Sequence, residues 1–219
     1  MSDDLSEGLA DELAAHRHGR VPRDLRRRQV VEVASALFAE AGFAGASMDE
    51  LARRVGVSKP VIYDLVGSKE ELFTVVTDRF AKELGDRVLL AVTGGDLDDR
   101  RRLEAGATAF FEFVAEREGA WAALGVAGAG PPAQGLDEVR RRQAELVTAL
   151  LAEWFRRGAE RTGRDAPDGA TVEALAHALN GAFEAVAIWW RTHRDRTPQD
   201  LARLVADLAG PGLERFAGG

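Results

Sequence analysis

The sequence predicts an all-α protein of about nine helices, with a three-helix head near the N-terminus and a helical body after it. Apolar residues recur at helical spacing over most of the 219 residues, and no stretch alternates apolar and polar residues as a half-buried strand does. Breaks rich in Gly or Pro separate the helical stretches. A chain that is 46% hydrophobic and 30% charged has the usual composition of a globular protein with a core.

The helical stretches divide the chain into three expected parts. Residues 1–23 are polar and weakly patterned, which is typical of a mobile arm, with one short helical stretch near residues 5–15. The head covers residues 24–70 and the body residues 71–219. The first expected helix runs from about Asp24 to Gly42, and a pair of short helices follows over 47–66. The next runs from Ser68 to about Val92. The remaining expected helices cover 97–118, 120–127, 135–162, 168–193 and 198–209.

Residues 47–66 carry the most informative pattern, that of two short helices joined at a glycine. Ser47 is expected to cap the first helix, and Glu50, three residues on, completes a capping box. Gly56 stands where a helix ends in the left-handed conformation. Ser58 is expected to cap the second helix, and Pro60 is tolerated in its first turn. A second helix entered in this way presents its N-terminal residues to a DNA major groove.

The charge distribution supports a DNA-binding head on an acidic chain. The net charge is −7, yet residues 17–60 hold nine basic and five acidic groups. Exposed charges interact mainly within about 8–10 Å at physiological salt, so a local positive patch suffices to attract phosphate. The alternative is that Arg26–Arg28 form only a solvated helix start. With no cysteine, no apolar run of membrane-spanning length and no signal-peptide core, the sequence favours a cytoplasmic protein without a membrane segment.

Three segments together resemble the TetR/AcrR family of bacterial transcriptional regulators. They are Phe38–Phe43 (Phe-Ala-Glu-Ala-Gly-Phe), Ser47–Tyr63, and Gly67–Phe73 (Gly-Ser-Lys-Glu-Glu-Leu-Phe). The resemblance covers roughly residues 24–75. It implies a homodimer, formed through helices near 168–193 and 198–209, whose recognition helices enter successive major grooves of a palindromic DNA operator, about 34–36 Å apart. It further implies a repressor, more rarely an activator, that a small and largely apolar effector releases from DNA.

The candidate DNA-binding residues follow from the motif and from this resemblance. Lys59 is expected to reach a guanine edge or a phosphate, and Tyr63 a phosphate. Pro60 and Val61 offer apolar surface to a thymine methyl group. Capping and ordinary surface charge remain the alternative for the two serines and Lys69. The full set is Arg26, Arg27, Ser47, Ser58, Lys59, Pro60, Val61, Tyr63 and Lys69.

The end of the recognition helix departs from the family pattern. Leu65 replaces a phosphate-binding side chain, and Val66 is a smaller core residue. Asp64 lowers DNA affinity unless it accepts a hydrogen bond from a cytosine amino group or pairs with an arginine. Arg20, Arg23 and the run at 26–28 are expected to supply the missing phosphate contacts.

The body holds most of the large aromatic residues, which either fill a core or line an effector pocket. His177 and Asn180, one turn apart, either orient a ligand in an apolar pocket or form a polar cluster in the core or an interface. Ala174, Ala178 and Trp189 lie on one face of the same expected helix. The candidate ligand-binding residues are Phe80, Phe110, Phe113, Trp121, Trp154, Phe155, His177, Asn180 and Phe183.

Two other classes of protein compete with a transcriptional regulator. An all-α enzyme is disfavoured because cysteine is absent and the four histidines lack the spacing of an HExxH motif, so no catalytic residue, metal or cofactor is predicted. An all-α ligand-binding or adaptor protein with weak or no specific DNA binding is favoured only by Asp64 and Leu65.

Overall fold

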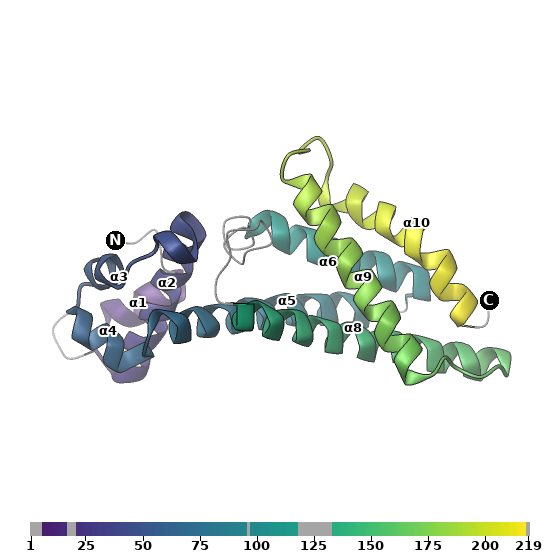
Figure 1. Cartoon of the computed structure of the whole chain (residues 1–219), viewed down its shortest axis with the longest axis horizontal. Coiled ribbons are helices and arrows are strands. Elements are labelled where there is room, and N and C mark those ends of the chain that lie inside the picture. The colour runs from purple at the N-terminus through teal and green to yellow at the C-terminus, as the bar shows by residue number, and fades with distance from the viewer. Residues whose placement is uncertain (1–5, 17–20, 96, 118–132, 218–219) are drawn as a thin grey trace. The chain divides into compact units, whose positions relative to one another are not determined.

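The computed structural model describes residues 6–16, 21–95, 97–117 and 133–217, and all the regular structure in them is helical (Figure 1). The chain divides into two compact units, a head (Met1–Phe80 and Glu118–Leu136) and a body (Ala81–Arg117 and Asp137–Gly219). None of the described helices is long and apolar enough to span a bilayer. The nine helices of the described residues are α1 (Glu7–Ala14), α2 (Arg23–Gly45), α3 (Met48–Val55), α4 (Lys59–Val66), α5 (Lys69–Thr93), α6 (Asp99–Glu116), α8 (Ala133–Thr162), α9 (Gly169–Trp190) and α10 (Pro198–Phe216).

An aromatic cluster at the end of α2 holds the head together. Gly42 has φ +67°, which interrupts the helical geometry of α2 at the residue where the sequence predicts its end, and the ring of Phe43 stacks on that of Phe38. The rings of Phe38 and Phe43 both lie 5.1 Å from the ring of Phe73 on α5, measured between centroids. Phe38 and Phe73 are buried, so α2 and the start of α5 share one core.

The helix-turn-helix forms as predicted, but two of its predicted caps differ. Ser47 Oγ accepts a hydrogen bond from the backbone N–H of Glu50 at 3.1 Å. The carboxylate of Glu50 does not complete the capping box, because it binds two arginines of its own helix instead. Gly56 adopts the expected left-handed conformation with φ +77°. Ser58 occupies the N-cap position of α4, yet its side chain makes no capping hydrogen bond.

The start of α5 contains a complete capping box. Ser68 Oγ accepts from the N–H of Glu71 at 3.1 Å, and the Glu71 carboxylate accepts from the N–H of Ser68 at 2.7 Å. Hydrogen bonds to this carboxylate, first from the Ser68 backbone N–H and then from the Ser68 side chain, lower the pKa of Glu71. The head includes the residues of α5 up to Phe80, whereas the sequence predicts a boundary after residue 70.

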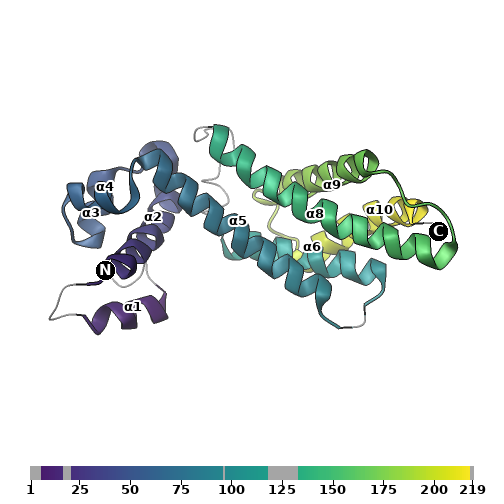
Figure 2. The same ribbon diagram turned by 90° about the horizontal axis from the view of Figure 1, so that it is seen from below.

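A short helix precedes the three-helix motif. The helical stretch expected near residues 5–15 is α1, which lies alongside α2 (Figure 2). Leu9 is buried, and Glu12 accepts two hydrogen bonds from the guanidinium of Arg28, at 2.8 and 3.2 Å. The mobility of the remaining arm stays a prediction, since residues 1–5 and 17–20 lie outside the described residues.

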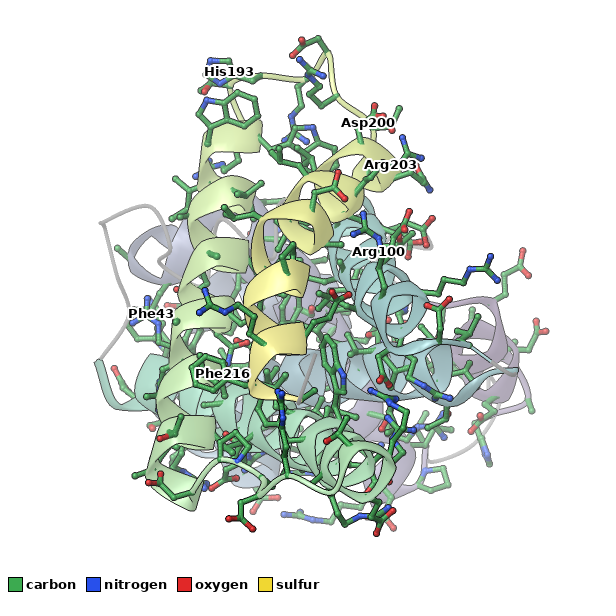
Figure 3. The ribbon with its side chains drawn as sticks, turned by 90° about the vertical axis from the view of Figure 1, so that its right-hand side faces the viewer. Phe43, Arg100, His193, Asp200, Arg203 and Phe216 are labelled. Carbon is green, nitrogen blue, oxygen red and sulfur yellow. The ribbon has the colours of Figure 1, made fainter. Side chains whose placement is uncertain are left out.

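The body packs α6, α8, α9 and α10 around an apolar core. Helix α10 makes its most extensive contact with α6, where Arg100 pairs with Asp207, and it lies beside α9 (Figure 3). One cluster of this core joins α8, α9 and α10. Its buried residues are Leu151, Trp154, Phe155, Val172, Ala176, Leu213 and Ala217.

The last helix is longer than predicted. The sequence led us to expect an end at residue 209, but α10 continues through Pro211 to Phe216. Proline inside a helix removes one backbone hydrogen bond. These seven extra residues, about two turns, bury Leu213 against the core and bring the ring of Phe216 to 6.3 Å from that of Phe155, so packing outweighs the loss. The helix expected at 120–127 lies outside the described residues.

Candidate nucleic-acid interface

Helix α4 divides its side chains between the core of the head and its exposed surface. Ile62, Leu65 and Val66 are buried. The burial of Leu65 follows from its spacing of three from Ile62, which places both on the inner face of the helix. The predicted DNA-contacting residues all lie on the outer surface: Ser58, Lys59, Pro60, Val61 and Tyr63 are exposed. The helix is therefore anchored on one side and presents polar and apolar groups to a ligand on the other.

Lys59, the first residue of α4, is held by a carboxylate of the preceding helix. Its Nζ lies 2.8 Å from Oδ2 of Asp49 on α3. The hydrogen bond to Asp49 and the charge of that carboxylate raise the pKa of Lys59. The pair could not be predicted from local sequence spacing, because ten residues and a turn separate its members.

The arginines of α3 are also paired. Glu50 accepts from Arg53 at 2.7 Å and from Arg54 at 2.9 Å, and Arg54 also binds Glu40 of α2 at 2.7 Å. The hydrogen bonds from Arg53 and then Arg54 lower the pKa of Glu50 to about 2. These interactions connect α3 to α2 through charged groups at its C-terminal end.

The end of α4 is bound by arginines from the start of α2. The guanidinium of Arg23 pairs with the carboxylate of Asp64, which is one of the alternatives that the sequence left open. Arg23 Nη2 also donates to the backbone carbonyl of Asp64 at 2.7 Å, and Arg27 Nε donates to that of Leu65 at 3.3 Å. Arg23 and Arg27, which the sequence led us to expect at DNA phosphates, thus contact protein groups at the end of α4.

The two other basic candidates are also placed by contacts within the head. Arg26 Nη1 donates to the side chain of Gln29 at 2.5 Å. Lys69 lies at the start of α5 with its Nζ 4.5 Å from the centre of the Phe43 ring, a cation–π contact. Ser47 is exposed at the N-terminus of α3. The arginines of α2 do not all lie on one face, since Arg28 binds α1 and Arg23 binds α4.

The predicted ligand-binding residues separate into different parts of the chain. Phe80 belongs to the head and Trp121 lies outside the described residues. In the body, the rings of Phe110 and Phe183 are 5.1 Å apart. Trp154 and Phe155 form another pair, with rings 6.2 Å apart, in the α8–α10 part of the core. Phe113 is buried beneath the guanidinium of Arg87.

The two polar candidates on α9 have different surroundings. The Nδ2 atom of Asn180 is buried, and it has no hydrogen-bond partner among the described residues. His177 is exposed, so the structure does not bring it together with the buried aromatic residues. Glu184, a turn beyond Asn180, lies 3.5 Å from Arg140 of α8. Of the two, only Asn180 is oriented towards the interior.

Several apolar side chains are exposed on α9 and α10. Ala174, Ala178 and Ala185 are exposed along α9. In Figure 3 the two helices lie side by side, with His193 just beyond one end of α9 and Phe216 towards the end of α10. The large apolar side chains exposed on these helices are Ile188, Trp189, Leu204, Leu208 and Phe216.

Comparison with known proteins agrees with this architecture. The family model described as bacterial regulatory proteins, tetR family, matches residues 30–76. A second family model, described as tetracyclin repressor-like, C-terminal domain, matches residues 100–210, about half of the chain. Together the two matches cover the helix-turn-helix and most of the body.

Individual relatives are regulators of the same kind. The HTH-type transcriptional activator FasR of Mycolicibacterium smegmatis is 45% identical over 100 residues, a match that spans 45% of this chain and 44% of FasR. The HTH-type transcriptional regulator EthR of Mycobacterium tuberculosis is 29% identical over 171 residues, 75% of this chain and 74% of EthR. The crystal structure of a TetR-like transcriptional regulator from Rhodococcus sp. RHA1 aligns with a TM-score of 0.65 and 28% identity, covering 89% of this chain and 98% of that one. The chain therefore belongs to the TetR family of bacterial transcriptional regulators, and residues 47–66 are its DNA-binding helix-turn-helix.

Proposed function

We propose that the protein is a homodimeric repressor that binds a palindromic operator in the cytoplasm and is released from it by a small, largely apolar molecule. The observation that carries the DNA-reading part is the division of α4. Its apolar residues anchor it in the head, while Lys59, Pro60, Val61 and Tyr63 are exposed together. This is the arrangement that a recognition helix needs to reach base edges in a major groove.

The proposed DNA contacts divide into base reading and phosphate binding. Lys59 reads a base edge, and Pro60 and Val61 contact a thymine methyl group. Tyr63 and Lys69 bind phosphate. The N-termini of α3 and α4, at Ser47 and Ser58, offer backbone N–H groups to phosphates, and Arg26 and Arg27 extend this set along α2.

Dimerisation through α9 and α10 is supported by their exposed apolar surface. Large apolar side chains gathered on the surface often mark a site of protein–protein contact. Small residues along α9 allow a second helix to approach closely, and Trp189, Leu204 and Leu208 supply apolar area for burial. A second copy of this chain is the partner that a palindromic operator requires.

Effector binding is supported by Asn180 and the aromatic residues around it. A buried amide without a partner is unfavourable, and a polar group of a ligand would satisfy it. Phe183 lies one turn further along α9 and contacts Phe110, which offers an apolar wall beside that amide. We propose Asn180, Phe183 and Phe110 as the centre of the effector site.

Activation of transcription is a second candidate. The relative that is 45% identical over 100 residues is named a transcriptional activator. The same DNA-binding protein produces either outcome according to where its operator lies. A reporter gene behind the operator distinguishes them: repression predicts higher expression when the regulator is deleted, and activation predicts lower expression.

Selection of bound fragments from genomic DNA tests the proposal directly. The full chain is expected to retain a small set of fragments that share a palindrome with half-sites one DNA turn apart. Its affinity for them should fall as salt rises, because phosphate contacts release counterions. If no fragment is retained at low salt, the chain is instead a ligand-binding or adaptor protein that keeps only the fold.

A further inference from the structure

The last turn of the recognition helix is held by a pair of arginines 38 and 41 residues away in the sequence. The final carbonyl groups of a helix have no partner within it. Two of them, those of Asp64 and Leu65, accept hydrogen bonds from Arg23 and Arg27. The positive guanidinium groups also stand at the negative end of the α4 dipole, where cations are favoured.

The ion pair between Arg23 and Asp64 is exposed, with 63% and 67% of the two side chains accessible. Exposed pairs of this kind contribute little to folding stability, because water competes with them and both side chains lose freedom. Its effect is therefore to be sought in DNA binding, since Asp64 follows Tyr63 on the helix that reads DNA.

We propose that Arg23 is a positioning residue for the recognition helix and that Asp64 keeps the positive charge of Arg23 from binding DNA phosphate. The inference rests on the proposed operator binding and deepens it. Bound to the carboxylate and the carbonyl of Asp64 at once, Arg23 ties the end of α4 to α2. The pair lowers affinity for DNA of any sequence and raises the ratio of operator to non-operator affinity.

Electrostatics explains why Arg23 does not serve as a simple phosphate contact. If its guanidinium moved to a phosphate, the Asp64 carboxylate would face the polyanion without its partner. Like charges at short range repel, so this exchange is opposed as long as Asp64 is present. Removing the carboxylate frees Arg23 for phosphate and leaves only its hydrogen bond to the backbone.

The head contains a matched control for this pair. Arg28, also on α2, binds Glu12 of α1 through two hydrogen bonds, and the side chains are 58% and 51% exposed. The chemistry and the exposure are similar, but among the described residues Arg28 pairs with α1 and not with the recognition helix. Variants at Arg28 and Glu12 therefore report the effect of losing such a pair elsewhere on α2.

The test measures dissociation constants of the full chain and its variants for a selected operator and for a non-operator duplex of equal length, over a series of KCl concentrations. The variants are Arg23→Ala, Asp64→Ala, their combination, Arg23→Lys, and the controls Arg28→Ala and Glu12→Ala. Thermal melts monitored by circular dichroism confirm that each variant is folded. The fluorescence anisotropy of labelled DNA gives both affinities and the slope of log affinity against log salt.

We expect Asp64→Ala to tighten non-operator binding, to steepen its salt slope by about one, and to lower the operator preference. In that background, Arg23→Ala should restore the original slope. In the wild-type background, Arg23→Ala should weaken operator binding with little change in slope. Arg23→Lys should resemble Arg23→Ala, because lysine keeps the charge but lacks the two-pronged donor. The variants at Arg28 and Glu12 should leave the operator preference unchanged.

A wild-type salt slope that decreases by about 0.9 in Arg23→Ala and is restored in Arg23→Lys would identify Arg23 as a phosphate contact and overturn the inference. Additive effects of Arg23→Ala and Asp64→Ala on operator affinity would do the same, because coupled residues are not additive. If the wild-type chain retains no operator, the proposed function fails first and this inference fails with it. If it retains one, only the inference is at stake.

Discussion

Lys59, the first residue of the recognition helix, is bound by Asp49 of the preceding helix, with 2.8 Å between Nζ and Oδ2. The positive charge of the ammonium group proposed to read a base is thus already paired with a carboxylate of the protein. Binding to DNA requires it to exchange a carboxylate for a guanine edge or a phosphate. The exchange makes Asp49 a determinant of how strongly the head discriminates between DNA sequences.

Substitutions at the two members of this pair should have opposite effects on DNA binding. Asp49→Asn should tighten binding to operator and non-operator duplexes alike, because it removes a negative charge beside the helix. Lys59→Ala should relax the preference at one base pair in each half-site, where a good base contact is worth about 1–3 kcal/mol. Binding to a set of single-base operator variants measures both. An unchanged preference in Lys59→Ala would exclude a base contact.

Tyr63→Phe should weaken binding to every DNA sequence without altering base preference. The Tyr63 side chain is exposed, so loss of its hydroxyl removes a phosphate hydrogen bond and no core contact. The melting temperature should stay close to that of the wild type.

Lys69→Ala should likewise reduce affinity for all sequences and make the salt slope shallower by about one. A selective change in base preference in either variant would contradict these roles.

Glu50 should make folding stability depend on acid pH. Hydrogen bonds from Arg53 and Arg54 lower its folded-state pKa to about 2, below the unfolded-state value. For a carboxylate with a depressed pKa, the stabilising contribution is complete above the unfolded-state pKa and is lost as pH falls through the folded-state value. The melting temperature of Glu50→Gln should thus lie below that of the wild type near neutral pH.

The difference between the two proteins should shrink below the unfolded-state pKa of Glu50, about 4.3, and vanish only below its folded-state pKa of about 2. Thermal melts over a pH series measure it, with Glu50→Gln in an Arg53→Gln and Arg54→Gln background as the control. In that background Glu50 has lost both donors, so its substitution should have a smaller effect that varies little with pH. A wild-type difference that does not vary with pH would show that the ion pairs contribute nothing in solution.

Leu208→Glu should convert the dimer to a monomer. Leu208 is 75% exposed on α10, and a charge there would be buried without a partner in the proposed dimer. Leu90→Glu is the matched control, because Leu90 is equally exposed, at 74%, but lies on α5 and not on either helix of the proposed interface. Sedimentation velocity should give a monomer for the first variant and a dimer for the second. A dimer for both would place the interface elsewhere.

The local features of the helix-turn-helix were predictable from short stretches of sequence. Gly56 takes a left-handed conformation, and Ser68 and Glu71 form a capping box, because each depends on backbone groups within about one turn. The all-α class is equally local in origin, since helical periodicity spreads over most of the chain. These signals also identify the elements that meet DNA.

Charged partners and helix lengths depend on distances that no short stretch encodes. Sequence spacing favours Glu50 as half of a capping box, yet two arginines compete for its carboxylate. It offers Asp64 several partners, and the packing of α2 against α4 selects Arg23. It predicts an end of α10 before Pro211, and the burial of Leu213 carries the helix past it. Residues 47–66 by themselves determine a recognition helix with an exposed reading face, whereas the tertiary structure decides which charges on that face are already paired, because ion pairs form between whichever groups packing brings within reach.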